Sequence, residues 1–287
     1  MEPGPNYPGA FAADRPDHLA YVMADGGQQV TYAQLDEAAS RIARVLHDAG
    51  LRPGDHMAFC MENHPDFFAV AWGAHYAGLY YTAISSRLTA EEVAYIVNDS
   101  GAKAFVASSY TGATAAAIVA DTPGVQARFT VDGPIDGYAD LHDAMSAADP
   151  TPLPDRVEGM DMLYSSGTTG RPKGVKVPVP EVALGSANPL LGLILGLFGA
   201  DADTVYLSPA PLYHAAPLRF SMSVQRLGGT VIVMEHFSPE RALELIEQHK
   251  VTFTQMVPTM FVRMLKLPEE ARARHDVSSL RSVVHAA

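Results

Sequence analysis

The sequence Ser165-Ser166-Gly167-Thr168-Thr169-Gly170-Arg171-Pro172-Lys173-Gly174 lies between two apolar segments, residues 160–164 and 175–177. Both segments are predicted to be strands, so the ten residues form a loop between them. The glycines allow backbone N–H groups to approach an anion closely, and the four hydroxyls can donate hydrogen bonds. Lys173 adds a positive charge of the kind that often binds phosphate. A loop of this composition suits the polyphosphate of a nucleotide.

Two other interpretations of this loop are weaker. A Walker loop needs Gly-Lys-Ser/Thr followed by a helix, whereas Lys173 is followed by Gly174 and a β-branched run. Gly, Ser, Thr and Pro are also ordinary residues of surface loops. That explanation suffices for any one of the ten residues, but not for all ten together after an apolar strand.

The composition is that of an ordinary soluble globular protein. The chain has 287 residues, 48% of them hydrophobic and 18% charged, which is enough for one large or two modest domains. A formal net charge of −12 argues against nucleic acid and anionic membranes as partners. Cys60 is the only cysteine, so no intramolecular disulfide can form. No secretory signal is recognised at the N-terminus, and a cytoplasmic location is expected.

The pattern along the chain predicts an α/β fold. Short apolar runs alternate with helical periodicity, which is typical of a mostly parallel sheet with helices on both faces. Helix starts are predicted at the capping boxes Thr31/Gln34 and Thr89/Glu92, and at Ser238-Pro239. Residues 1–16 are expected to be a loose arm.

The uncharged apolar run at residues 190–200 is shorter than the about 20 residues that a membrane span requires. It is therefore predicted to be a buried helix beside a ligand tunnel. A helix that touches a membrane surface, as a peripheral contact, is the alternative.

Residues 164–175 resemble the signature loop of the adenylate-forming, or acyl-activating, superfamily, which includes acyl-CoA synthetases, peptide-synthetase adenylation domains and beetle luciferases. The similarity extends over nearly the whole chain and is strongest to bacterial fatty-acyl-CoA synthetases. Residues 31–35 and 75–79 are similar to the first two core motifs of the family. Pro211-Leu212-Tyr213-His214 matches the aromatic–histidine pair that acyl-CoA synthetases carry near the acyl group. Residues 279–287 resemble the strand that leads into the adenine-binding loop.

The resemblance implies two mixed, mostly parallel sheets with helices packed between and outside them. Residues 1–287 would form an incomplete N-terminal domain. Its first sheet subdomain would be about residues 70–180, ending in the phosphate loop, and its second, truncated subdomain about residues 17–69 plus 181–287. The C-terminal domain with its catalytic lysine is expected to be absent, as are the family's magnesium-binding glutamate and ribose-binding aspartate.

By the same resemblance, the parent protein would join a carboxylic acid, most simply a fatty acid, to coenzyme A with ATP and Mg²⁺ through an acyl-adenylate. The residues implied to bind the phosphates are Ser165, Ser166, Gly167, Thr168, Thr169, Gly170 and Lys173. His214 would stand between the acyl pocket and the approach of the thiol. No residue of the chain is assigned to a metal, and the fragment alone is expected to be inactive.

Several alternatives remain open at this point. One alternative is the substrate class of an aryl-acid or bile-acid-type CoA ligase, or of a fatty-acyl-AMP ligase that loads a polyketide system. Another is that the chain itself is a non-catalytic remnant that binds nucleotide or acyl chain. An unrelated kinase is disfavoured because the sequence has neither a Walker lysine nor a set of metal-binding carboxylates. A truncated second sheet would expose apolar surface, so a homo-oligomer or self-association is expected.

Overall fold

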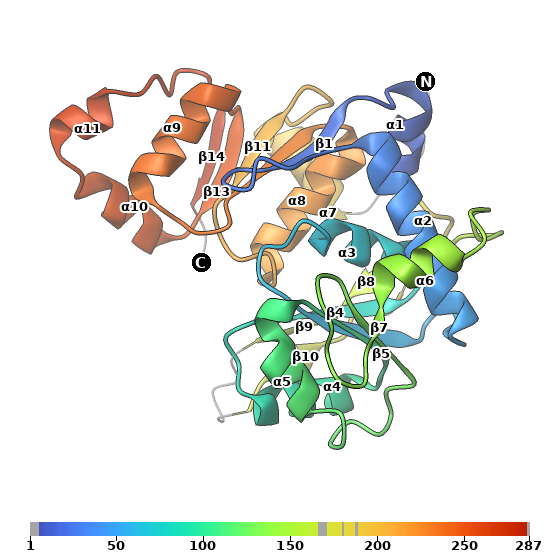
Figure 1. Cartoon of the computed structure of the whole chain (residues 1–287). Helices are drawn as coiled ribbons and strands as arrows, with labels where there is room; N and C mark the ends of the chain where they lie inside the picture. Colours follow the sequence, from blue (N-terminus) through green and yellow to red (C-terminus); the bar gives the residue numbers. More distant parts are fainter. Residues whose placement is uncertain (1–5, 166–170, 180, 187–188, 286–287) are drawn as a thin grey trace. The chain divides into compact units, whose positions relative to one another are not determined.

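The computed structural model describes residues 6–165, 171–179, 181–186 and 189–285 (Figure 1). The chain divides into two compact units, one of residues 1–35 and 187–287 and the other of residues 36–186. The first change of unit lies between Leu35 and Asp36, whereas the sequence led us to expect it near residue 69. The physical reason is the strand of residues 56–60, which is hydrogen-bonded inside the sheet of the second unit.

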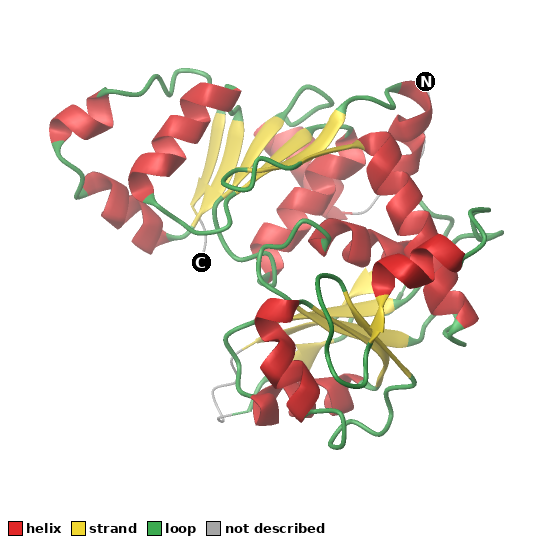
Figure 2. Cartoon of the chain, viewed as in Figure 1, coloured by secondary structure: helices red, strands yellow, loops and turns green. Residues whose placement is uncertain are grey.

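The unit of residues 36–186 is built on a six-stranded sheet in the order β7-β6-β5-β3-β4-β8, with every neighbouring pair parallel. Figure 2 shows the strands in yellow and the helices in red. Its strands are β3 (His56–Cys60), β4 (Tyr80–Ile84), β5 (Ala102–Ala107), β6 (Ala127–Thr130), β7 (Ala139–Asp140) and β8 (Met160–Asp161). Its helices are α3 (Phe67–Tyr76), α4 (Ala90–Ser100), α5 (Gly112–Ala117), α6 (Leu141–Ala147), the 3-10 turn η1 (Ser109–Thr111) and most of α2 (Tyr32–Asp48).

Helices cover both faces of this sheet because successive strand residues point to opposite sides. Ala58 and Cys60 of β3 belong to an apolar cluster with residues of α4 and α5. Phe59, between them, packs its ring 5.1 Å from that of Phe67 at the start of α3. The strands are accordingly apolar at nearly every position, as expected for a parallel sheet buried on both sides.

A separate two-stranded antiparallel ribbon carries the phosphate loop. It consists of β9 (Leu163–Ser165) and β10 (Lys173–Val175). The single strand predicted over residues 160–164 is therefore two short strands. Met162 separates them: its N–H still donates to Tyr81 of β4, while the next residues pair with β10.

The other unit contains the second six-stranded sheet, in the order β14-β13-β11-β12-β1-β2. All of its pairs are parallel except β1–β2. Its strands are β1 (Leu19–Met23), β2 (Gln29–Thr31), β11 (Val205–Ser208), β12 (Thr230–Val233), β13 (Phe253–Met256) and β14 (Ser282–His285). Its helices are α1 (Pro8–Asp14), α7 (Pro189–Phe198), α8 (Ala215–Leu227), α9 (Pro239–His249), α10 (Pro258–Leu265) and α11 (Glu269–Ala273). Two six-stranded, mostly parallel sheets confirm the predicted α/β class.

The side chains of β11 point alternately to the two faces of this second sheet and show which helix covers each face. The Tyr206 ring stacks on that of Phe220 in α8, at 6.4 Å between centroids. Leu207, the next residue, belongs to the apolar cluster that includes Leu245 and Ile246 of α9. Helices α8 and α9 therefore lie on opposite faces.

The predicted helix starts are confirmed. The N–H of Thr31 donates to the Gln34 side chain and the N–H of Gln34 donates to the Thr31 hydroxyl. Thr89 and Glu92 form the same reciprocal pair at α4, and the Ser238 hydroxyl accepts from a backbone N–H at the start of α9. The sequence predicts a loose arm over residues 1–16. This prediction is wrong for residues 8–14, which form helix α1.

Helix α7 differs from the buried helix predicted for this stretch. Leu191 and Ile194 are buried, but Leu193, Leu195 and Leu197 are 46%, 45% and 68% exposed. A helix that is apolar all round leaves apolar residues outside when only one face meets the sheet. No helix among the described residues has both the length and the apolar character needed to cross a bilayer.

We predict opposite effects for one substitution in two helices. Gly73 lies where α3 crosses α2, and a Cβ there would come within 2.4 Å of Ile42 Cγ2. Gly73→Ala should lower the free energy of unfolding by about 1–3 kcal/mol, because the overpacking outweighs the helix propensity of alanine. Urea denaturation of the purified chain measures this effect.

The matched variant is Gly192→Ala in α7, where an added Cβ has no heavy atom within 4 Å. It should leave stability unchanged or raise it by up to about 1 kcal/mol, the helix propensity difference. Equal destabilisation by the two variants would contradict the close approach of α2 and α3.

Candidate functional site

The candidate phosphate site is the loop that joins β9 to β10. Five of its predicted residues, Ser166, Gly167, Thr168, Thr169 and Gly170, lie outside the described residues. The structure describes the two ends of the loop, where Ser165 and Lys173 are directly opposite each other in the antiparallel register. Both side chains are exposed, so a hydroxyl and an ammonium group stand side by side at the base of the loop.

Helix α4 holds both ends of the loop. On the incoming side, the Tyr164 hydroxyl donates to Asp99 Oδ2 at 2.6 Å. On the outgoing side, the Tyr95 hydroxyl donates to the Pro172 carbonyl at 3.4 Å, and the Arg171 guanidinium lies 5.3 Å from the centre of the Tyr95 ring. Tyr95 and Asp99 are four residues apart and therefore share one face of the helix. Two side chains of a rigid helix thus fix the stems of the ribbon.

The Tyr164 hydroxyl keeps its proton in the contact with Asp99. Burial raises the pKa of the Tyr164 hydroxyl far above its ordinary value, and the hydrogen bond to Asp99 and its charge raise this pKa further. The hydroxyl therefore remains a donor wherever the protein is folded. Gly174 lies opposite Tyr164, and a Cβ there would come within 2.9 Å of Tyr164 Cζ and 2.5 Å of Met162 Cε. A glycine is needed at this position because the tyrosine ring lies over it.

The segment after β10 is tied to the amino end of the sheet. Lys176 Nζ lies 2.9 Å from His56 Nε2 and 4.5 Å from the centre of the Tyr80 ring. The Tyr80 hydroxyl donates to the Val177 carbonyl and accepts from the Val179 N–H, both at 2.9 Å. The His56 and Tyr80 rings stack at 4.5 Å.

His56 is held in its neutral form. Burial is the largest cause and the Lys176 charge the next, and together they lower its pKa to about 4. Neutral Nε2 can then accept a hydrogen bond from the ammonium group of Lys176. The segment that follows β10 is therefore anchored to the amino ends of β3 and β4.

This arrangement suits the binding of an anion. Lys173 and Ser165 offer a charge and a hydroxyl donor, and the antiparallel pairing of their backbones places these two residues opposite each other. Binding a phosphate group between preorganised donors costs less conformational entropy than binding it to donors that become ordered only on binding.

His214 belongs to the other unit, where it follows the carboxyl end of β11 and precedes α8. Its side chain is exposed, and its ring lies 4.6 Å from that of Tyr213, which is buried. The structure therefore brings the predicted aromatic–histidine pair together at the start of a helix.

The sequence analysis missed the residues that anchor the loop. Tyr95, Asp99, His56 and Tyr80 lie between 65 and 120 residues along the chain from their partners, so only tertiary packing brings them together. The sequence did contain one indication of Tyr95 and Asp99. They lie four residues apart and outside the apolar face of the predicted helix that begins after Thr89, so they share a second face of that helix.

Comparison with known proteins assigns the chain to a family. The profile described as "AMP-binding enzyme" matches residues 10–287. The chain is 33% identical over 270 residues to a feruloyl-CoA synthase of an Amycolatopsis species, with 92% of this chain and 50% of that protein covered. It is 31% identical over 262 residues to the long-chain-fatty-acid–CoA ligase FadD13 of Mycobacterium tuberculosis, with 88% and 49% covered. The chain thus spans about half the length of these curated relatives.

The fold is also that of a solved structure. An inhibitor-bound N-terminal domain of FACL13 from Mycobacterium tuberculosis superposes with a TM-score of 0.82 at 27% identity. The superposition covers 97% of this chain and 68% of that one.

The lowered pKa of His56 predicts a dependence of stability on pH. Its ordinary value is 6.5, so as the pH falls the unfolded chain takes up this proton before the folded chain does. The stabilisation is complete above pH 6.5 and is lost as the pH falls towards 4. Between pH 6.5 and 4.5 the wild type should lose about 1–2 kcal/mol more of its free energy of unfolding than His56→Asn, after allowance for partial solvation.

Urea denaturation at a series of pH values measures this difference. His47→Asn, at an exposed ion pair with Asp48, serves as the control and should follow the wild type. Identical pH profiles for the wild type and His56→Asn would show that His56 titrates normally in the folded state.

Proposed function

Because the chain belongs to the AMP-binding enzyme family, we propose that it is the N-terminal portion of an AMP-forming acyl-CoA ligase. The observation that carries this proposal is the anchored loop with Lys173 and Ser165 at its base, inside a family match that spans residues 10–287. Both curated relatives described above are named as CoA ligases or synthases, which supports the same reaction class.

The proposed reaction has two steps. A carboxylate oxygen attacks the α-phosphorus of ATP, the bond to the β-phosphate breaks, and pyrophosphate leaves. The sulfur of coenzyme A then attacks the acyl carbon, and AMP leaves with the bonding electrons. Neither step needs a nucleophile from the protein, so catalysis consists of alignment and charge stabilisation.

Each residue of the site has a proposed role. Lys173 and the hydroxyls of the loop, including Thr169 in the part that is not described, hold the β- and γ-phosphates as charge develops on the leaving pyrophosphate. His214 is proposed to stand between the acyl group and the approaching thiol and to gate access by position. Mg²⁺, when bound with ATP, would neutralise phosphate charge, and for this role we assign it no ligand in the chain.

We propose a fatty acid as the substrate, since the chain carries an extended apolar helix at α7. The relatives support two substrate classes about equally, because one is named for feruloyl-CoA and the other for long-chain fatty acids. A panel of hexadecanoate and ferulate distinguishes them. We further propose that the protein acts in the cytosol, as expected for a chain with one buried cysteine.

A second candidate is a chain that binds nucleotide or acyl group without turnover. The chain spans about half the length of the curated relatives. Measuring ATP–pyrophosphate exchange separates the two, when the 287-residue chain is compared with a version extended to the length of those relatives. Exchange in the extended version alone would identify this chain as a non-catalytic part of the enzyme.

We predict that Lys173→Ala and Thr169→Ala each lower the rate of ATP–pyrophosphate exchange in the extended version. Loss of one donor to a developing charge costs about 100-fold in rate. The effect should appear in kcat more than in the KM for the acid, because the acid does not touch these groups.

Lys250→Ala is a suitable control, since its ammonium lies in an exposed ion pair with Asp276. It should leave exchange unchanged. Wild-type rates in both loop variants would refute the assignment of the loop to the phosphates.

We also predict self-association through apolar surface on the unit that contains the second sheet. The exposed apolar residues there include Leu193, Leu195, Leu197, Val262, Leu265 and Val283. Light scattering should give a mass above the 30.7 kDa of one chain, and Leu193→Ser with Leu197→Ser should lower it. A strictly monomeric wild type at every concentration would contradict this prediction.

A further inference from the structure

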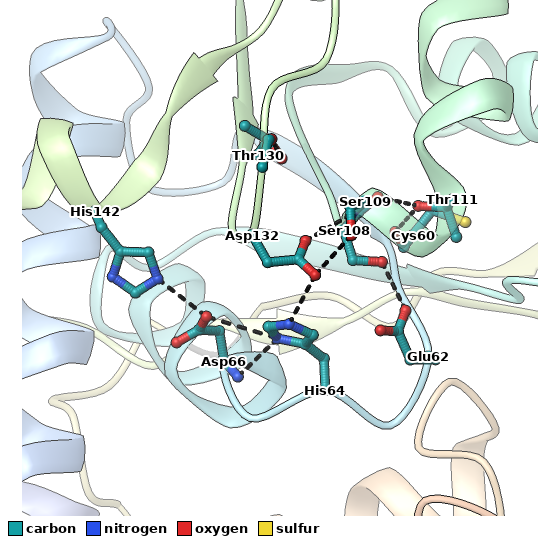
Figure 3. Close-up of polar contacts among 11 residues, drawn as sticks. Cys60, Glu62, His64, Asp66, Ser108, Ser109, Thr111, Thr130, Asp132 and His142 are labelled. Atoms are coloured by element: carbon teal, nitrogen blue, oxygen red, sulfur yellow. Dashed lines mark hydrogen bonds and ion pairs between the residues drawn. The ribbon is translucent and has the colours of Figure 1, made fainter.

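A cluster of polar side chains, built from residues outside the phosphate loop, lies at the carboxyl edge of the all-parallel sheet (Figure 3). Glu62 and His64 follow β3, Ser109 follows β5, and Asp132 follows β6. Three neighbouring strands therefore deliver these groups to one place, because the carboxyl ends of parallel strands share an edge.

The topology marks this edge as a place for ligands. From β3 the chain proceeds to β4 on one side, and then returns to β5 on the other side of β3. The loops that follow β3 and β5 consequently diverge from each other. In open α/β sheets, ligands bind in the crevice formed at such a reversal of strand order.

The spacing of the side chains fits one metal ion. Glu62, His64 and Asp132 each present a ligand atom, and these atoms all lie within 4.8 Å of one another. His64 is almost buried, with 11% of its side chain exposed, while Asp132 is 34% exposed. An ion about 2.0–2.2 Å from each atom would need only small inward movements of the three side chains.

We propose that Glu62, His64 and Asp132 form a binding site for a divalent transition-metal ion of the Zn²⁺ or Mn²⁺ class. One imidazole nitrogen and two carboxylate oxygens are a donor set that such ions accept. The two carboxylates balance the charge of the ion. Three protein ligands leave positions for water, so the site is open.

Neighbouring groups already orient the ligands. The Ser108 hydroxyl donates to Glu62 Oε2 at 2.6 Å. The N–H and the hydroxyl of Ser109 donate to the two oxygens of Asp132. Carboxylates that are held in this way lose little freedom when they bind an ion.

The partner on the far side of His64 fits the same role. Asp66 Oδ2 lies 3.6 Å from His64 Nδ1 and is itself held by His142 Nε2 at 3.1 Å. Metal-bound histidines commonly donate their second ring N–H to such a carboxylate. In this structure Nδ1 accepts from the Asp66 backbone N–H at 3.1 Å, so the ring proton is on Nε2, 3.5 Å from Asp132. Binding of an ion at Nε2 would require this proton to move to Nδ1, where a hydrogen bond to the Asp66 carboxylate would replace the one from the Asp66 backbone N–H.

The charges of the cluster also favour a cation. Among the described residues, Asp66 pairs with His64 and His142, and Asp132 pairs with His64. A divalent ion would place two positive charges beside these carboxylates.

Titration calorimetry of the 287-residue chain with ZnCl₂, and separately with MnCl₂, tests the proposal. One ion should bind per chain. Glu62→Gln and Asp132→Asn should each weaken binding at least about 10-fold, and Asp66→Asn by about 10-fold through the orientation of His64. The wild type should gain thermal stability from Zn²⁺, and Asp132→Asn should gain less.

The matched control is His47→Asn, which removes an exposed histidine that also pairs with an aspartate, Asp48. Its affinity should equal that of the wild type. If the ligand variants do not fold, broadening of the His64 ring signals of the wild type by Mn²⁺ in NMR spectra provides the second test. Absence of stoichiometric binding, equal affinities in all variants, or broadening at His47 in place of His64 would overturn the proposal.

Discussion

The candidate site depends above all on the hydrogen bond from the Tyr164 hydroxyl to the Asp99 carboxylate. It joins the strand that enters the phosphate loop to a helix capped at its start by Thr89 and Glu92. Tyr95, one turn earlier, holds the strand that leaves the loop. Because one helix holds both strands, the Ser165–Lys173 pair at the base of the loop has a defined geometry. Burial and the neighbouring Asp99 raise the pKa of the Tyr164 hydroxyl far above its ordinary value, so it remains the donor in this contact.

The two six-stranded sheets use the carboxyl ends of parallel strands for their polar chemistry. In one unit, β11 leads into Tyr213 and His214. In the other, β3, β5 and β6 lead into the cluster of Glu62, His64 and Asp132 (Figure 3). The strands themselves are filled with apolar side chains on both faces, which leaves their ends as the places where charged groups remain partly solvated. The amino end of the first sheet instead holds His56 and Tyr80, which anchor the chain after the loop.

Membership of the AMP-binding enzyme family and the proposed ligase reaction explain the loop and give His214 a role, but they give no role to the cluster at β3, β5 and β6. That cluster is built from different residues, and its carboxylates pair with histidines. The proposal that this cluster binds a metal ion is therefore independent of the reaction proposed for the loop.

The sequence by itself determined what depends on near neighbours along the chain. The capping pairs Thr31/Gln34 and Thr89/Glu92 located two helix starts, because a cap is a contact across three residues. The Gly, Ser and Thr composition with Lys173 is the basis of the phosphate loop that we propose. Only the tertiary structure decided what joins distant residues. The boundary between the units lies after residue 35, because β3 is hydrogen-bonded to β4 and β5. Tertiary packing also places Asp99 beside Tyr164 and Asp132 beside His64. Such contacts depend on strand order and helix packing, which local periodicity does not specify.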